Sequence, residues 1–188
     1  MFSEERVAQM AAYLLSRDGG RMAYLKLIKL LYLSDRKSLD LFGDSISGDR
    51  FVAMKHGPVL SQTYDLVKNG GEDEDKGWNH WISGKENYEV ALKRALISHD
   101  SLDELSEADI EVMDSIFAEF GNMNKYQIRD FTHDHCAEWQ NPGQTSVAIP
   151  MSATFAALGK GAELSEQMHS KILEREQLDQ ILSAYKLG

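Results

Sequence analysis

One apolar stretch decides the fold: residues 22–42, MAYLKLIKLLYLSDRKSLDLF. Apolar side chains occur on nearly every side of the helix that this stretch predicts, a pattern typical of a central helix packed against several neighbours. Gly43 follows directly and is expected to end the helix. Lys26 and Lys29 interrupt the run, so it is too polar to cross a bilayer.

Further amphipathic helices are predicted around this central one. Two of them begin with a capping box, because Ser106 is followed three residues later by Asp109, and Asn124 by Gln127. Apolar side chains then recur at helical spacing until a Gly or Pro stops the pattern. The helices expected in this way span residues 3–18, 106–121, 124–139, 152–158 and about 162–185.

Two β-hairpins are also predicted. The first spans residues 45–53 with its turn at Gly48-Asp49, since Gly at the first turn position suits the mirror-type turn that matches strand twist. The second spans residues 78–92 with a five-residue loop at 83–87. Gly57-Pro58 is expected to open a helix, because proline at the first helical position loses no hydrogen bond.

The fold class expected from these elements is α+β and predominantly α-helical. We expect a helical bundle around a buried central helix, with a small antiparallel sheet made of the two β-hairpins. The length of 188 residues and a hydrophobic content of 43% suit one domain with a substantial core. Residues 1–188 are therefore expected to form a single domain.

Composition limits the classes of function. Twenty Lys and Arg against thirty Asp and Glu give a net charge of −10, which argues against a protein that coats nucleic acid. A single cysteine, Cys136, excludes an internal disulfide. The N-terminus has no basic region followed by an apolar stretch, so we expect a soluble cytoplasmic protein.

One pair of side chains is a candidate metal or thiol site. His133 and Cys136 are three residues apart and share a face of the predicted helix, so they could supply two zinc ligands, with His56, His80 or His99 as further ligands. The pair is also a candidate for thiol catalysis. The structural alternative is that His133 hydrogen-bonds a neighbouring loop and Cys136 is a small buried side chain.

Asp35 closes the apolar run of the central helix. A buried carboxylate without a partner is costly, so we expect an ion pair that ties the helix to the hairpin after it. Lys26, Lys29 and Arg36 are the nearest cations in the sequence. The alternative is an acid/base role for Asp35.

Three motifs mark the chain. They are LKLIKLLYLSDR at 25–36, ISGDRFVAMKHGPV at 46–59 followed by Tyr64, and Thr132-His133 followed by Trp139. Together they resemble the Panacea domain, the SocA-like antitoxin family that includes many phage-associated proteins. The resemblance covers a core of about residues 5–142, and its motif positions in this sequence are Lys29, Tyr32, Asp35, His133 and Trp139.

The resemblance implies a protein that is not an enzyme, needs no cofactor, and binds and neutralises a cognate protein toxin. For some members it implies a role as a proteolytic adaptor that hands the toxin to a protease. Neither nucleic acid nor a membrane is expected as a partner. The C-terminal helical extension, about residues 151–185, is expected either to add a second contact or to cap the domain.

The hairpin and its flanks form the predicted contact face. Exposed charge and a rigid turn occur together there, as in many binding sites. The residues of this face are Asp49, Arg50, Lys55, His56, Gly57, Pro58 and Tyr64. A structural role as turn, helix start and packing group explains the last three equally well.

Two other classes of function are compatible with the sequence. An enzyme or metalloprotein based on His133 and Cys136 predicts bound zinc or a thiol of low pKa. A DNA-binding regulator would have to use residues 1–60, which carry nine basic and seven acidic side chains. That segment contains no convincing recognition-helix pattern.

Overall fold

The computed structural model describes residues 1–71, 74–94 and 101–161, and beyond them only residues 166–167, 170, 173–174, 177–178 and 181. In chain order the elements are α1 (Glu4–Arg17), β1 (Arg21–Ala23), α2 (Tyr24–Phe42), β2 (Phe51–Met54), β3 (Gly57–Leu60), α3 (Ser61–Asn69), α4 (Trp78–Trp81), β4 (Glu89–Ala91), α5 (Glu107–Phe120), α6 (Lys125–His135), β5 (Val147–Ala148) and α7 (Met151–Ala157). The α+β, mostly helical class is confirmed.

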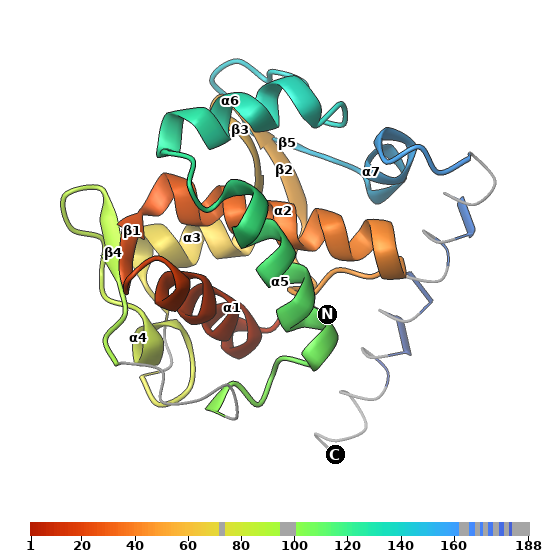
Figure 1. The fold of residues 1–188 in the computed structure, drawn as a ribbon. Helices are drawn as coiled ribbons and strands as arrows, with labels where there is room; N and C mark the ends of the chain where they lie inside the picture. Colours follow the sequence, from red (N-terminus) through yellow and green to blue (C-terminus); the bar gives the residue numbers. More distant parts are fainter. Residues whose placement is uncertain are drawn as a thin grey trace.

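Helix α2 is the central element that its sequence predicts. It crosses the middle of the molecule, with α1 on one side, α6 and the β2–β3 hairpin on the other, and α5 in front (Figure 1). Twelve of its nineteen residues are buried. Gly43 ends it in the left-handed conformation at φ 74° and donates its N–H to the carbonyl oxygen of Leu39, as in an αL cap.

The two predicted capping boxes are confirmed. Ser3 accepts the N–H of Arg6 at the start of α1, and α5 and α6 begin with complete capping boxes at Ser106 and Asn124. The end of α6 was predicted four residues too late. The helix stops at His135, so Trp139 lies beyond it and not on its apolar face.

The first hairpin forms, but not where the sequence pattern placed it. Strands β2 and β3 pair antiparallel with Met54 opposite Gly57, so the turn is at Lys55-His56 and not at Gly48-Asp49. Gly57-Pro58 begins a strand, and the helix starts at Ser61. Proline fits there because β3 is an edge strand, where a missing N–H removes no ladder bond that a neighbour needs.

The second hairpin is only partly confirmed. Residues 78–81 form the short helix α4, and the chain reverses at Asn87-Tyr88, not across a five-residue loop. Strand β4 pairs antiparallel with β1. The strands therefore belong to two sheets, β1-β4 and β3-β2-β5, in place of one sheet made of two hairpins.

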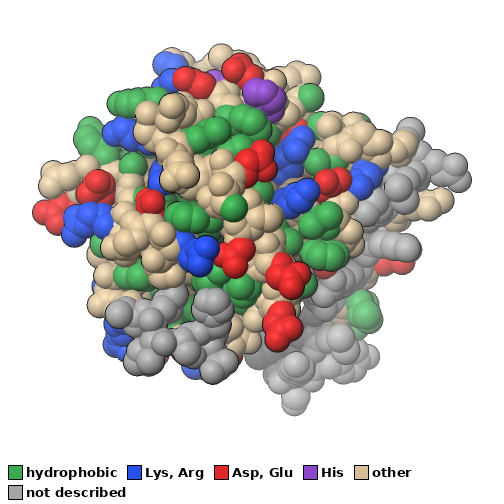
Figure 2. Space-filling model, in the orientation of Figure 1, with side chains coloured by type: hydrophobic (Ala, Val, Ile, Leu, Met, Phe, Trp, Pro, Cys, Tyr) green, Lys and Arg blue, Asp and Glu red, His purple; other side chains and the backbone are tan. Residues whose placement is uncertain are grey.

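The predicted helix at 152–158 corresponds to α7. The predicted helix at about 162–185 lies mostly outside the described residues. Among the described helices, none has both the length and the apolar character that a bilayer crossing requires. On the face seen in Figure 2, the side chains drawn include basic and acidic groups interspersed with hydrophobic ones, so they form no extended region of one charge sign.

Candidate functional site

The β2–β3 hairpin is the candidate functional site, because four of the seven predicted contact residues lie on it and the other three lie within four residues of its strands. Lys55 and His56 are exposed at its tip, and Arg50 is exposed just before β2. Gly57 and Pro58 are buried in β3. The hairpin thus presents a charged tip on a buried base.

Lys29 of α2 holds the base of the hairpin from below. Its side chain is 0% exposed, and its Nζ donates to the carbonyl oxygen of Pro58 at 2.7 Å. Burial lowers the pKa of Lys29 to about 7, because a charged ammonium is disfavoured away from water. Its bond to β3 connects the central helix directly to the hairpin.

Trp139 and His133 hold the other strand. The indole Nε1 of Trp139 donates to the carbonyl oxygen of Met54 at 2.9 Å. The imidazole of His133 stacks on the indole with ring centroids 4.3 Å apart and planes 3° apart. Burial lowers the pKa of His133, which favours the neutral ring at neutral pH.

Gly57 lets these groups approach the turn. Its φ of 97° is a conformation that side-chain-bearing residues rarely adopt. A Cβ at this position would lie 2.7 Å from Nζ of Lys29 and 2.9 Å from Cδ2 of His133. Both the backbone conformation and the close approach therefore require glycine.

Asp49 anchors the segment that leads into the hairpin. It is only 3% exposed, and its carboxylate accepts the N–H groups of Arg50, Gln62 and Thr63 and the hydroxyl of Thr63. Gln62 and Thr63 lie in the first turn of α3, whose own N-cap residue, Leu60, offers no side-chain acceptor. Asp49 therefore caps α3 from a distance and supports the predicted contact face from inside.

The expected ion pair of Asp35 is not present among the described residues. Its carboxyl group accepts the N–H of Ser47 at 3.0 Å and also the hydroxyl of Ser47. Burial raises the pKa of Asp35 to about 7, with the Ser47 bonds opposing the rise. Asp35 therefore fixes the loop before β2 through hydrogen bonds in place of an ion pair.

Glu138 is a buried residue of the site that no sequence motif pointed to, and it is 8% exposed. Its carboxylate accepts the hydroxyl of Tyr32 at 2.5 Å and the Nε of Arg36 at 2.6 Å. This network ties α2 to the segment that carries Trp139. Only its position beside Trp139 singles Glu138 out in the sequence, because its two partners lie about a hundred residues earlier.

Two observations on the described residues count against the thiol and metal alternatives. Burial, chiefly, raises the pKa of Cys136 to about 12, so its nucleophilic thiolate is scarce at neutral pH. In the part of the chain that the structure describes, no three His, Cys, Asp or Glu side chains gather as a metal site. His99 lies outside that part.

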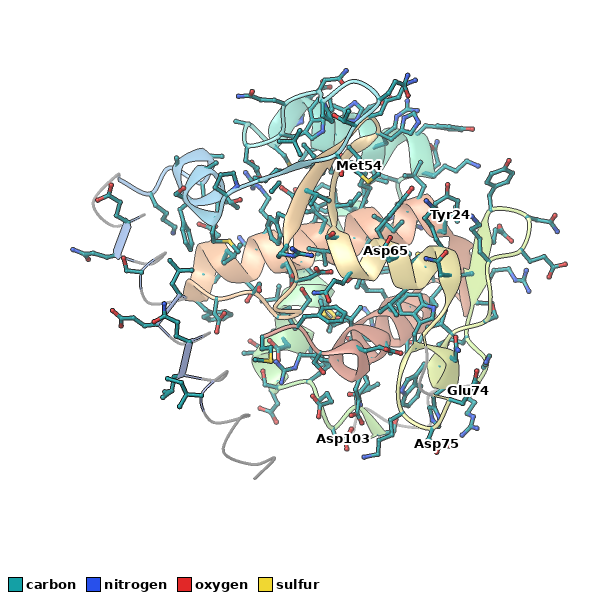
Figure 3. All side chains as sticks on the ribbon, turned by 180° about the vertical axis from the view of Figure 1, so that it is seen from behind. Tyr24, Met54, Asp65, Glu74, Asp75 and Asp103 are labelled. Carbon is teal, nitrogen blue, oxygen red and sulfur yellow. The ribbon has the colours of Figure 1, made fainter. Side chains whose placement is uncertain are left out.

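Tyr64 is the one predicted contact residue that lies in α3. Its ring is partly buried, and the ammonium of Lys68 lies 4.8 Å from the ring centroid. On the side opposite to that of Figure 1, Tyr24, Met54 and Asp65 lie close together in the view (Figure 3). Tyr64 therefore belongs to α3 and not to the hairpin itself.

Comparison with protein families gives one match. The family model described as "Antitoxin SocA-like, Panacea domain" matches residues 27–140. The match begins within α2 and ends just after Trp139, so it contains the hairpin together with Lys29, Asp49 and His133. Comparisons with curated proteins and with solved structures gave no significant match.

Proposed function

Because the chain belongs to the SocA-like antitoxin family with a Panacea domain, we propose that it binds a cognate protein toxin and neutralises it. The family description supports an antitoxin role and a protein partner. The identity of the toxin and the surface that binds it are parts of the proposal. We place the contact at the β2–β3 hairpin, with Arg50, Lys55 and His56 exposed toward the toxin.

We place the contact at the hairpin because buried side chains from other parts of the chain hold both of its strands. Lys29 binds the backbone of β3, and Trp139 binds the backbone of β2, from two different parts of the chain. Asp49 fixes the approach to β2 and the first turn of α3 together. A loop that is rigid before binding loses little conformational freedom in the complex, which favours affinity.

A second route to neutralisation is delivery of the toxin to a protease. In that case the chain acts as a proteolytic adaptor, and a protease is a further partner. The two routes differ in one measurable quantity, the half-life of the toxin. Direct neutralisation leaves the toxin intact in the complex, whereas delivery shortens its half-life whenever the chain is present.

The proposal is tested first by finding the toxin. A tagged copy of the chain is expressed in its native host, and we expect a protein to copurify in near-stoichiometric amount. That protein should be toxic when expressed alone and harmless together with the chain, and a pulse-chase measurement of its half-life separates the two routes. If no copurifying protein is toxic by itself, the antitoxin proposal is wrong.

The contact face is tested with charge reversals at the hairpin. Arg50→Glu with Lys55→Glu should weaken toxin binding by about 10- to 100-fold, because both charges face solvent in the free protein. The matched control is Arg17→Glu with Lys37→Glu on α1 and α2, which should bind the toxin normally. Unchanged neutralisation by a folded hairpin variant would remove the hairpin from the contact.

A further inference from the structure

An open groove of about 290 Å³ lies beside the tip of the hairpin, and three tyrosines line it. Tyr24 begins α2, Tyr88 sits in the turn before β4, and Tyr126 lies in the first turn of α6. His56 of the hairpin tip forms part of the same lining. Tyr88 is 69% exposed and Tyr126 55% exposed, so two large aromatic rings face solvent here.

Cationic side chains lie over these rings. The Nζ of Lys85 is 5.0 Å from the ring centroid of Tyr24, and the Nζ of Lys125 is 5.2 Å from that of Tyr126 and 6.0 Å from that of Tyr88. Such distances are those of cation–π contacts. Lys125 therefore lines the groove itself, and Lys85 lies over Tyr24, one of the rings that line it.

The charges of Lys85 and Lys125 are available to a partner. Neither takes part in the ion pairs found between the described residues. Arg129, which also lines the groove, differs because it pairs with Asp130 at 2.6 Å. Two unneutralised ammonium groups beside aromatic rings favour carboxylates attached to an apolar segment.

Tyr88 occupies a position whose backbone favours glycine. Glu86 and Glu89 exchange both backbone hydrogen bonds, at 3.0 and 2.8 Å, around a two-residue turn. Both turn residues have positive φ, 50° for Asn87 and 64° for Tyr88, as in the mirror-type turn that prefers Asn-Gly. A bulky residue in this conformation is strained, and strain of this kind gathers at functional sites.

We propose that this groove binds an acidic segment of a partner protein, with an apolar side chain against Tyr24, Tyr88 and Tyr126 and carboxylates at Lys85 and Lys125. Tyrosine is enriched among the residues that dominate binding energies at protein interfaces. The inference rests on the proposed function only in taking that partner to be the toxin. Contact through the groove and the adjoining hairpin tip, which share His56, then forms one continuous surface.

A polyanion such as single-stranded nucleic acid fits this surface less well. Its phosphates need an extended basic channel, whereas the chain as a whole carries a net charge of −10. Figure 3 shows Glu74, Asp75 and Asp103 at an edge of the molecule well away from Tyr24. A short acidic peptide meets the local cations without extending over that edge.

The test uses the full chain and three fluorescent probes. They are a short peptide in which a Phe is flanked on each side by glutamates, its counterpart with lysines in place of the glutamates, and an oligothymidylate of the same length. We expect saturable binding of the glutamate peptide only, measured by fluorescence anisotropy, and weakening of that binding with rising salt. Equal binding of the lysine peptide, tighter binding of the oligothymidylate, or no binding of any probe would overturn the proposal.

Two variants locate the site. Tyr88→Gly removes the backbone strain of the turn and should raise the Tm by about 2–4 °C. It should nevertheless weaken binding of the glutamate peptide by about tenfold. Lys125→Glu should weaken peptide binding by a similar factor. It should not unfold α6, because an acidic residue is favourable at a helix N-terminus. The matched controls are Phe42→Ala, another exposed aromatic, and Lys37→Glu, and they should bind the peptide normally.

Toxin binding by the two variants distinguishes failure of the groove proposal from failure of the antitoxin proposal. If Tyr88→Gly and Lys125→Glu lose affinity for the toxin as they do for the peptide, the groove is part of the contact. If both variants neutralise the toxin as the wild type does, the groove assignment fails while the antitoxin function stands. If no toxin exists but the glutamate peptide still binds through Tyr88 and Lys125, the groove stands and the antitoxin proposal fails.

Discussion

Helix α1 and the junction beneath the β2–β3 hairpin are both buried, but different interactions hold them. The buried face of α1 is almost entirely apolar, from Val7 to Leu15. The junction instead buries Lys29, Asp35 and Asp49 and connects each to backbone or hydroxyl groups. The stability of an apolar face depends on the volume and area that it buries. The stability of a buried polar junction depends instead on particular hydrogen-bond partners and on pH.

The largest loss of stability is expected for a substitution in the apolar face of α1. Leu14→Ala removes a side chain that is 0% exposed and leaves a cavity, so it should lower the free energy of unfolding by about 2–5 kcal/mol. The loss should be the same at pH 6 and pH 9, because no titratable partner is involved. Urea denaturation at the two pH values measures it, and a loss that depends strongly on pH would contradict the comparison.

A somewhat smaller effect is expected for Asp49→Ala. This change leaves the N–H groups of Gln62 and Thr63 without their acceptor and uncaps α3, at a cost of about 2–4 kcal/mol. Asp49→Asn keeps one acceptor oxygen and should recover part of the loss. If Ala and Asn at this position are equally stable in urea denaturation, the carboxylate is not acting as a remote cap.

The next largest effect is the change in the free energy of unfolding with pH, which the buried Lys29 causes. Lys29 has a pKa of about 7 in the folded protein and 10.5 in the unfolded chain, so between these values the unfolded chain binds more protons. The free energy of unfolding should therefore rise with pH in that window, by about 2 kcal/mol between pH 7 and 9. In the same window Lys29→Met should show a flatter profile.

Asp35 titrates mostly below this window and opposes the rise in the free energy of unfolding only near pH 7. Its pKa rises from 3.8 to about 7 on folding, so between these values the folded protein binds more protons. Its contribution to stability is fully present below pH 3.8 and is lost as the pH rises through about 7. Identical slopes for the wild type and Lys29→Met above pH 7 would show that Lys29 is not desolvated.

The smallest effect on function is expected for Cys136→Ala. The thiol is buried with a raised pKa, so the change should cost about 1 kcal/mol of stability through lost packing and leave toxin neutralisation unchanged. His133→Ala serves as the comparison, because it removes the ring stacked on Trp139. Complete loss of function in a folded Cys136→Ala protein would return weight to a thiol or metal mechanism.

Several local features could be predicted because their signals lie close together in the sequence. Ser106 with Asp109 and Asn124 with Gln127 are three residues apart, and both capping boxes form as expected. The hairpin was misplaced because Gly57-Pro58 suits a helix start as well as an edge strand. The acceptor that would have corrected this, Asp49, lies thirteen positions before Gln62.

The sequence by itself determined the buried central helix, the helix caps, the mostly helical class and the family resemblance that the family match supports. Only the tertiary structure decided the strand pairing, the ties of Lys29 and Trp139 to the hairpin, and the meeting of Tyr24, Tyr88 and Tyr126 in one groove. The physical reason is distance along the chain. Helix periodicity and capping act within one or two turns, whereas buried polar groups and grooves take their partners from segments that only folding brings together.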